Sequence, residues 1–352
     1  MKVSLWLKGA LWVAWVLVFG GLAAQAQGNQ FNTNGNILIS DQFNNRVIEV
    51  NPDNHNIVWQ FGTGSNKPGP QTVVGVNDAQ RIGDFTLIAG TGIPPGGTPN
   101  CPNGCADNRV MLVDQAGTIV WQYGKAGVTG SGPDELNTPV QSTFLTNFDV
   151  LITDQGNQRV IEVNPLTNKI VWQYGRTGAA GCGTNELNSP NSAELLANGH
   201  ILIADESNNR VIEVNRSKAI VWSYGSCTGT ELSGAAFASR LPNGQTLITD
   251  SNNHRILAVT PAKKVVFDYD TTSQAGSCDA ANACPLPSRA VRLANGNTLI
   301  SNQFDDQVIE INPKKEIVFS QGHLGVAGSG FNELNAPYDA KVVGDYTGLT
   351  PP

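Results

Sequence analysis

The most regular pattern of chemically active side chains in this sequence is an aspartate followed, after a short loop, by an arginine. It occurs as Asp41 with Arg46, Asp154 with Arg159, Asp205 with Arg210, and Asp250 with Arg255. One such pair could serve as an acid and a base. A recurring pair is better explained as structure, in which the carboxylate accepts turn N–H groups and pairs with the guanidinium. In a further segment Asn302 and Gln307 replace both charges together, as expected of a structural unit.

The six cysteines, an even number, predict three disulfides. Cys101 and Cys105 are close enough to pair locally, as are Cys278 and Cys284, which leaves Cys182 to pair with Cys227. No histidine lies near them at metal-ligand spacing, so no metal site is predicted. Disulfides of this kind indicate an oxidising compartment.

The first 26 residues have the pattern of a signal peptide. Lys2 and Lys8 precede an apolar run from Gly9 to Ala23, and Ala24-Gln25-Ala26 has the small residues that signal peptidase prefers. The run is shorter than the roughly 20 residues of a spanning helix. We therefore predict a signal peptide over 1–26 and one mature domain over 27–352, exported to the periplasm or the extracellular space, with no membrane span after cleavage.

The charge balance is acidic, with 22 Lys and Arg against 29 Asp and Glu. Cleavage of the signal peptide removes Lys2 and Lys8 and makes the chain more acidic. This argues against nucleic acid as a partner, because phosphate backbones are bound by basic surfaces.

The elements that would position these side chains come from one tandem repeat. The segments ILISDQFNNRVIEVNPDNHNIVWQFG from Ile37, VLITDQGNQRVIEVNPLTNKIVWQYG from Val150 and ILIADESNNRVIEVNRSKAIVWSYG from Ile201 are its clearest copies. An aromatic residue in the last run marks each copy, with a period of about 50 residues: Trp59, Trp121, Trp172, Trp222, Phe267 and Phe319. This period is typical of one four-stranded propeller blade per repeat.

Each repeat contains four β-rich runs separated by turn residues. The N-terminal copy enters at its second run, and the chain ends with a first run, NELNAPYDAKVV, that lacks the other three. We therefore predict an all-β, six-bladed β-propeller of four-stranded antiparallel blades. Its ring is closed by N- and C-terminal strands in one shared blade. Residues 91–107 form an insertion in the second blade, which could cover one mouth of the channel.

Several of these segments resemble known repeat families. GVTGSGPDELNTP from Gly127, GVAGSGFNELNAP from Gly325 and DSNNHRI from Asp250 resemble NHL repeats, while LPNGQTLITD and LANGNTLIS resemble arylsulfotransferase-like and quinoprotein-like propellers. The resemblance covers nearly all of the mature chain. It implies the fold more strongly than an activity, since such propellers include enzymes, binding modules and scaffolds.

The first runs are expected to line the central channel, so positions that differ between them are candidates for binding. A gapless alignment gives a column of small residues, Ser142, Ala193, Ala238, Ala290 and Ala340, with Asp78 in the second blade. The preceding column is Asn77, Gln141, Ser192, Phe237, Arg289 and Asp339, with Tyr338 beside the last. The ligand-binding candidates taken from it are Asn77, Gln141, Arg289, Tyr338 and Asp339. Glu194, Lys341, Arg240 and Arg292 are secondary candidates on the same runs.

The candidate enzyme chemistries find little support in these residues. The arylsulfotransferase resemblance implies a histidine nucleophile, but none of His55, His200, His254 and His323 lies on a first run, and His254 is the nearest candidate. No catalytic residue and no cofactor are predicted, although Asp339 and Asp78 with neutral neighbours would suit calcium. We therefore expect a non-catalytic module that binds a small ligand, a glycan or a protein at a channel mouth. The alternative is an enzyme of the arylsulfotransferase, lyase or lactonase type.

Overall fold

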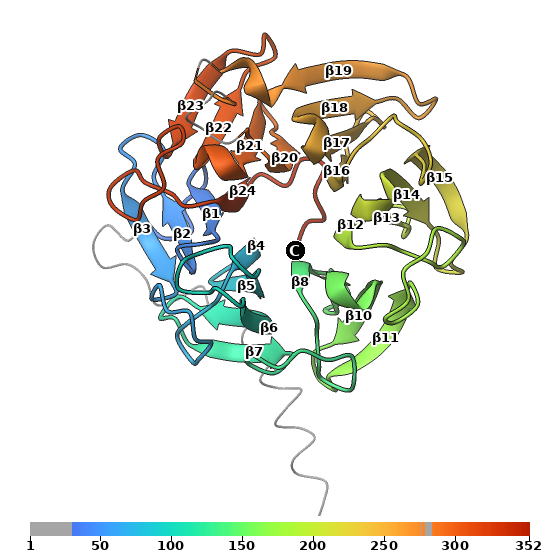
Figure 1. Cartoon of the computed structure of the whole chain (residues 1–352), viewed down its shortest axis with the longest axis horizontal. Helices are drawn as coiled ribbons and strands as arrows, with labels where there is room; N and C mark the ends of the chain where they lie inside the picture. The colour runs from blue at the N-terminus through green and yellow to red at the C-terminus, as the bar shows by residue number, and fades with distance from the viewer. Residues whose placement is uncertain (1–29, 275, 279–283) are drawn as a thin grey trace, which may run out of the picture.

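The computed structural model describes residues 30–274, 276–278 and 284–352. The predicted signal peptide lies outside these residues. Within them the strands form six four-stranded antiparallel sheets arranged as the blades of a ring (Figure 1). The predicted all-β, six-bladed propeller is therefore confirmed.

Each blade runs from an innermost strand at the channel to an outermost strand at the rim of the ring. In that order, blade 1 is β24 (Pro337–Val342), β1 (Ile37–Asp41), β2 (Arg46–Val50) and β3 (Ile57–Phe61); blade 2 is β4 (Val76–Ile82), β5 (Phe85–Ile93), β6 (Cys105–Asp114) and β7 (Ile119–Tyr123); blade 3 is β8 (Pro139–Phe144), β9 (Val150–Asp154), β10 (Arg159–Asn164) and β11 (Lys169–Tyr174). Blade 4 is β12 (Pro190–Leu195), β13 (Ile201–Asp205), β14 (Arg210–Val214) and β15 (Ile220–Gly225); blade 5 is β16 (Ala235–Arg240), β17 (Thr246–Asp250), β18 (Arg255–Val259) and β19 (Val265–Asp270); blade 6 is β20 (Pro287–Arg292), β21 (Thr298–Asn302), β22 (Gln307–Ile311) and β23 (Ile317–Gln321). Short 3₁₀ turns follow some strands: η1 (Gln155–Asn157), η2 (Glu206–Asn208), η3 (Ser251–Asn253), η4 (Thr271–Ser273) and η5 (Gln303–Asp305).

The ring closes in blade 1, where β24 from the C-terminal end pairs antiparallel with β1. The register sets Ile39 against Ala340 and Leu38 against Lys341. The predicted shared blade is thus confirmed, because β24 covers the inner edge of β1 and completes the four strands of blade 1.

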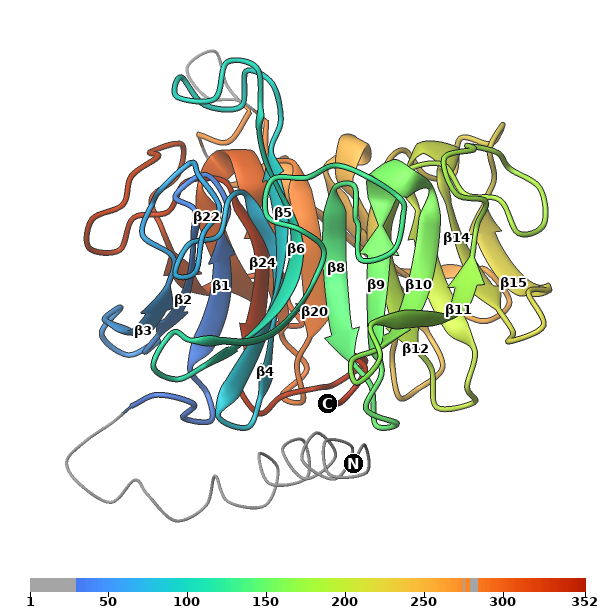
Figure 2. The same ribbon diagram turned by 90° about the horizontal axis from the view of Figure 1, so that it is seen from below.

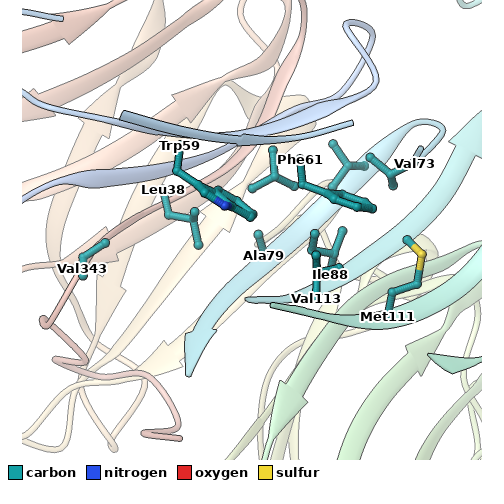
Figure 3. Close-up of a cluster of buried hydrophobic side chains, with 11 residues drawn as sticks. Leu38, Trp59, Phe61, Val73, Ala79, Ile88, Met111, Val113 and Val343 are labelled. Carbon is teal, nitrogen blue, oxygen red and sulfur yellow. The ribbon is translucent and has the colours of Figure 1, made fainter. Parts of the chain in front are cut away.

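The hydrophobic core lies between the blades. Figure 3 shows one cluster, in which Leu38, Trp59 and Phe61 of blade 1 pack against Ile88 and Met111 of blade 2, all of them buried. Similar clusters join the other neighbouring blades. Every blade therefore depends on both neighbours for burial of its apolar side chains.

The recurring tryptophans also link neighbouring blades. The indole N–H of Trp59 donates to the carbonyl oxygen of Gln115 at 3.0 Å, and that of Trp222 donates to the carbonyl of Pro261 at 3.0 Å. Trp121 and Trp172 bond in the same way to Asn168 and to the Arg216 carbonyl. This confirms that they serve packing between blades.

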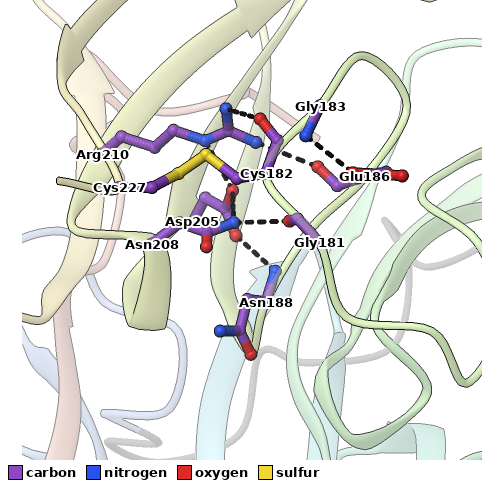
Figure 4. Close-up of a disulfide and its surroundings, with 9 residues drawn as sticks. All are labelled: Gly181, Cys182, Gly183, Glu186, Asn188, Asp205, Asn208, Arg210 and Cys227. Carbon is purple, nitrogen blue, oxygen red and sulfur yellow. Dashed lines mark hydrogen bonds and ion pairs between the residues drawn. A yellow bond between two sulfur atoms is a disulfide. The ribbon is translucent and has the colours of Figure 1, made fainter.

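The aspartate–arginine pairs form a unit that we call the blade clamp. In blade 4 the Asp205 carboxylate accepts from Asn208 at 2.8 Å and from Arg210 Nε at 2.7 Å, and Arg210 also donates to the carbonyl oxygens of Cys182 and Glu186 in the loop before the blade. Figure 4 shows this clamp beside the Cys182–Cys227 disulfide. The same pairing occurs at Asp41–Arg46, Asp154–Arg159 and Asp250–Arg255, so the structural interpretation is confirmed.

The second blade has a clamp that the repeat pattern did not reveal. Asp107 and Arg109, at the end of the insertion, pair at 2.5 Å, and Arg109 donates to the carbonyls of Gly69 and Thr72. The other predicted disulfides, Cys101–Cys105 and Cys278–Cys284, are present as well. Among the described residues no helix has the length and apolar character needed to cross a membrane.

Candidate functional site

The inner strands bring one side chain from each blade to the channel axis. The registers place Asp78 opposite Ala89 and Ala79 opposite Ile88, matching Arg289 opposite Ser301 and Ala290 opposite Ile300. Ala79 therefore belongs to the column of small residues, and the gapless alignment of the second blade was wrong by one residue. The axial column consists of Asp78, Gln141, Ser192, Phe237, Arg289 and Asp339, all of them buried.

Four members of this column join their blade to the next one by accepting a backbone N–H from its inner strand. Asp339 accepts from Ala79 at 3.3 Å, and Asp78 accepts from Ser142 at 3.1 Å. Gln141 and Ser192 accept in the same way from Ala193 at 2.6 Å and Ala238 at 3.2 Å. These side chains are engaged in holding the inner strands together.

Two cations balance the negative charges of the two carboxylates at the axis. Arg289 lies 3.0 Å from Asp78 and 2.6 Å from Asp339, and Lys341 Nζ lies 2.7 Å from Asp78 and 2.5 Å from Asp339. We call these four residues the axial charge cluster. Because both carboxylates are paired, they are not arranged to hold a calcium ion together.

The electrostatics of the cluster follow from its burial. Burial raises the pKa of Asp78, although Lys341 and Arg289 oppose this. Burial acts to lower the pKa of Arg289, but the nearby carboxylates of Asp339, Asp78 and Glu194 outweigh it and raise that pKa. The Arg289 guanidinium also lies over the Phe237 ring, 4.2 Å from its centroid. The charges of the cluster are thus paired with one another and largely buried at the channel axis.

One end of the channel is covered by the C-terminal segment, which crosses the axis in Figures 1 and 2. Glu194 accepts from the backbone N–H of Thr350 at 2.8 Å and from its hydroxyl at 2.5 Å. The Thr350 carbonyl accepts from Gln80 at 3.3 Å, and the Tyr346 hydroxyl donates to the carbonyl of Arg81 at 3.1 Å. Only about 20 Å³ of cavity remains between this segment and the axis.

The opposite end, from which the insertion projects in Figure 2, has an open cavity of about 500 Å³. This volume is in the range of ligand sites. One wall comes from the insertion, at Pro94, Pro95, Asn103 and Gly104, and the Cys101–Cys105 disulfide ties its base. The rest of the lining is rich in amides and includes Gln42, Asn77, Asn108, Asn137, Gln155, Gln303 and Tyr338. We call it the mouth cavity.

Hydrogen bonds connect the polar side chains at this mouth across several blades. Gln303 Nε2 donates to Gln42 Oε1 at 2.6 Å, and Gln42 Nε2 donates to Asn77 Oδ1 at 2.7 Å. On the other side, Asn191 Nδ2 lies 2.8 Å from the Tyr338 hydroxyl, so Tyr338 of blade 1 reaches across to blade 4. The side chains named here therefore form a network of amide and hydroxyl donors and acceptors at the mouth.

One carboxylate belongs to this network. Glu206 accepts from Asn191 at 2.9 Å and from Gln155 at 3.2 Å. Burial raises its pKa, and burial also raises the pKa of Tyr338. Glu206 and Tyr338 are therefore biased toward their neutral forms, which suits an uncharged polar ligand.

The structure separates the predicted binding residues into two groups. Asn77 and Tyr338 line the mouth cavity, whereas Gln141, Arg289 and Asp339 lie at the buried axis. Of the secondary candidates, Glu194 and Lys341 face the axis, while Arg240 and Arg292 pack over Trp222 and Phe267. Sequence reasoning missed Gln42, Glu206 and Gln303, and also Asn191 of the inner strand β12. The signal for the first three was the position after the clamp aspartate or its counterpart Asn302, which differs between blades.

The histidines are used elsewhere. His55 stacks on Phe319, His200 bonds to Glu213 at 2.7 Å, and His254 bonds to the Pro285 carbonyl at 2.5 Å. None of the four histidines is among the residues that line the mouth cavity in the described part of the chain. The described residues also contain no group of three or more His, Cys, Asp or Glu side chains suited to a metal ion.

Comparison with known families matches residues 106–303 to the family PQQ_2, described as "Outer membrane protein assembly factor BamB". The matched segment is more than half of the chain and spans blades 3 to 5 with parts of blades 2 and 6. It supports the quinoprotein-like part of the resemblance, while likeness to NHL and arylsulfotransferase repeats stays a prediction. No curated protein matches the chain.

Solved structures share the fold at low sequence identity. A protein of unknown function from Bacteroides caccae has a TM-score of 0.56 at 16% identity, over 82% of this chain and 93% of that one. A streptogramin B lyase gives 0.52 at 12%, over 84% and 80%. A catalytically inactive virginiamycin B lyase from Staphylococcus aureus with quinupristin gives 0.51 at 14%, over 84% and 87%. At these identities the likeness shows the fold alone.

Proposed function

This chain belongs to the PQQ_2 family, described as outer membrane protein assembly factor BamB, and we propose that it is an exported, non-catalytic propeller that binds a polar segment of a partner protein at the mouth cavity. The observation that carries the proposal is the contrast between the two channel ends. One is filled by the C-terminal segment, and the other is a cavity of about 500 Å³ walled by amides.

The chemistry of the mouth favours a peptide. Amide side chains such as Gln42, Asn77 and Gln303 offer both donors and acceptors, as a peptide backbone does in return. Phe304, next to Gln303 in the chain, is 40% exposed and would be available for an apolar contact with a partner. The family description, which names an assembly factor for proteins, also supports a protein partner.

Export is supported by the three disulfides, which persist in oxidising compartments. The acidic charge balance supports a partner other than nucleic acid. We retain the proposed division into a cleaved signal peptide over 1–26 and one mature domain over 27–352, with periplasm or extracellular space as the destination.

The proposal is tested by site-specific photo-crosslinking in the native host. A photoreactive residue at Asn103 or Gln303, at the mouth, should give one protein adduct, identified by mass spectrometry. The matched position Asn54, exposed in the turn between β2 and β3 on the opposite side, should give none. Gln42→Leu should reduce the mouth adduct at least tenfold while the protein still unfolds cooperatively, although the loss of its two hydrogen bonds will lower the melting temperature.

Two outcomes would contradict a protein-binding mouth. Equal adducts at Asn54 and Gln303 would indicate non-specific capture. Binding of the purified protein to a glycan array, lost in Gln42→Leu, would assign the mouth to a glycan instead. The enzyme alternative would have to use Glu206 with Tyr338, the ionisable pair of the mouth network, and turnover abolished by Glu206→Gln would favour it over a binding module.

A further inference from the structure

Blade 6 departs from the clamp found in the other blades. In blades 1, 3, 4 and 5 the aspartate at the end of the second strand accepts from an asparagine three residues later and an arginine five residues later, as for Asp154 with Asn157 at 2.8 Å and Arg159 at 2.7 Å. At the matching places blade 6 has Asn302, Asp305 and Gln307. In blade 6 the carboxylate therefore stands where the other blades have the asparagine, and no arginine is present in the clamp.

The backbone at this place is nevertheless the same. Asn302 pairs with Gln307 across β21 and β22, as Asp154 pairs with Arg159 across β9 and β10. The 3₁₀ turn η5 is followed by Asp306 in the left-handed region with φ 54°, and η1 is followed by Gln158 with φ 59°. The side chains of Asn302, Asp305 and Gln307 therefore start from the positions that bring the clamp side chains together.

Four of their six side-chain polar atoms are buried without a partner, while Gln307 Nε2 donates to the Gly322 carbonyl at 3.4 Å. Asn302 and Asp305 are 0% exposed and Gln307 is 5% exposed. Both polar atoms of the Asn302 amide, Oδ1 of Asp305 and Oε1 of Gln307 have no hydrogen-bond partner among the described residues. The other Asp305 oxygen accepts from the Ser277 hydroxyl at 2.8 Å. A buried negative charge and two buried amide oxygens without partners are costly to leave unmatched.

We infer that blade 6 binds one calcium ion where the other blades hold the arginine guanidinium. The ligands from the chain would be Oδ1 of Asp305, Oδ1 of Asn302 and Oε1 of Gln307. These are all oxygen donors, as hard cations require, and calcium accepts the irregular arrangement and water ligands that such a site needs. With a single carboxylate the affinity should be weak, with a Kd on the order of 10⁻⁴ to 10⁻³ M, typical of extracellular modules.

This site is independent of the mouth cavity and goes beyond the proposed function. Its role would be structural, since the clamp fastens the loop before each blade to the turn after the second strand. In Figure 1 blade 6 is the neighbour of the shared blade that closes the ring. Calcium would thus hold the blade next to the closure.

The first test is thermal unfolding of the mature protein in EDTA, in 10 mM CaCl₂ and in 10 mM MgCl₂. With a Kd near 1 mM, calcium should raise the melting temperature by about 2 °C, and magnesium should raise it less. Calcium titration followed by native mass spectrometry should give one ion per chain. A melting temperature equal in EDTA and in calcium would overturn the inference, because the site would then be satisfied by a protonated Asp305.

The second test restores the clamp of the other blades in blade 6. The triple variant Asn302→Asp, Asp305→Asn, Gln307→Arg should melt in EDTA at or above the temperature of the wild type in calcium, with no calcium response. Asp305→Asn alone should also lose the response, which keeps the inference testable if the triple variant does not fold. The control Asp53→Asn, an exposed turn residue, should respond to calcium as the wild type does. A full response in Asp305→Asn would place the ion elsewhere and overturn the inference.

Discussion

Replacement of Arg289 by methionine tests whether the channel axis is a structural seal or a ligand surface. Arg289 is 2% exposed and lies within 3.0 Å of Asp78 and 2.6 Å of Asp339. Methionine keeps much of the volume over the Phe237 ring but removes one of the two cations of the axial charge cluster. Lys341 would then face two buried carboxylates alone.

The expected magnitude follows from this geometry. Removing one partner of a buried ion pair costs about 3–5 kcal/mol, because the remaining charge is left buried without compensation. Arg292→Met is the matched control, since Arg292 is on the same strand, packs over Phe267 and has no carboxylate partner among the described residues. Its loss should cost about 1 kcal/mol or less, from the lost cation–π contact.

The assay is equilibrium unfolding in urea for both variants and for Arg289→Met combined with Asp339→Asn. The double variant removes one charge of each sign, so it should be more stable than the sum of the single effects predicts, by about 1–3 kcal/mol. The reasoning is refuted if Arg289→Met is no more destabilising than Arg292→Met, or if the double variant is additive within about 0.5 kcal/mol. The axis would then be hydrated and open to a ligand.

The remaining predictions concern closure, the disulfide and pH. Deletion of residues 332–352 removes β24 and the segment that covers one channel end, so a melting temperature unchanged by it would contradict ring closure by the chain ends. Replacing Cys182 and Cys227 by serine should lower the free energy of unfolding by about 3–4 kcal/mol, given their separation of 45 residues, and should leave the melt insensitive to reductant at this bond. Burial raises the pKa of Asp305 to about 6, while the Ser277 hydrogen bond and His254 act to lower that pKa and Asp306 acts to raise it. The calcium-induced rise in melting temperature should therefore be present above pH 6 and be lost as the pH falls through 6. In EDTA the sign is opposite, since a raised carboxyl pKa makes the folded state less stable as the pH rises from about 4 to 6, and Asp305→Asn should remove that slope.

The sequence repeats made the fold, the blade clamps and the contacts between blades predictable. The clamp and the interblade tryptophans recur at fixed positions in several repeats, so their structural role could be inferred from the sequence. The shared blade followed from a first run without partners at one end of the chain and three runs without a first at the other. The disulfides followed from spacing, since Cys101 with Cys105 and Cys278 with Cys284 lie close in the chain.

The alignment of the second blade failed for a local reason. Ala79 pairs with Ile88 across a turn, whereas Ser142 pairs with Ile152, so the turn between β4 and β5 is one residue shorter than that between β8 and β9. A gapless alignment from the second strand therefore shifted the first strand by one position. The shift moved Asp78, a member of the axial charge cluster, into the column of small residues and put Asn77 in its place.

The mouth network could not be predicted because its members come from different parts of each repeat. Tyr338 is on an inner strand of blade 1 and meets Asn191 of blade 4, while Gln42 and Gln303 follow second strands. No spacing along the chain encodes such contacts, since they arise only when the ring closes. The same holds for Lys341 and Asp78, which lie at opposite ends of the sequence.

A difference between repeats is not by itself evidence of a binding surface, as the axial column shows. Asp78, Arg289 and Asp339 differ from their counterparts, yet they are buried and neutralise one another. A ring with exact repetition could not build such a cluster, because identical charges would meet at its centre. Divergence is therefore required for closure as well as for binding. Solvent access distinguishes residues that serve closure from residues that serve binding. Asn77 and Tyr338 also differ between blades, but they line an open cavity. The function is therefore proposed at the mouth cavity and not at the axis.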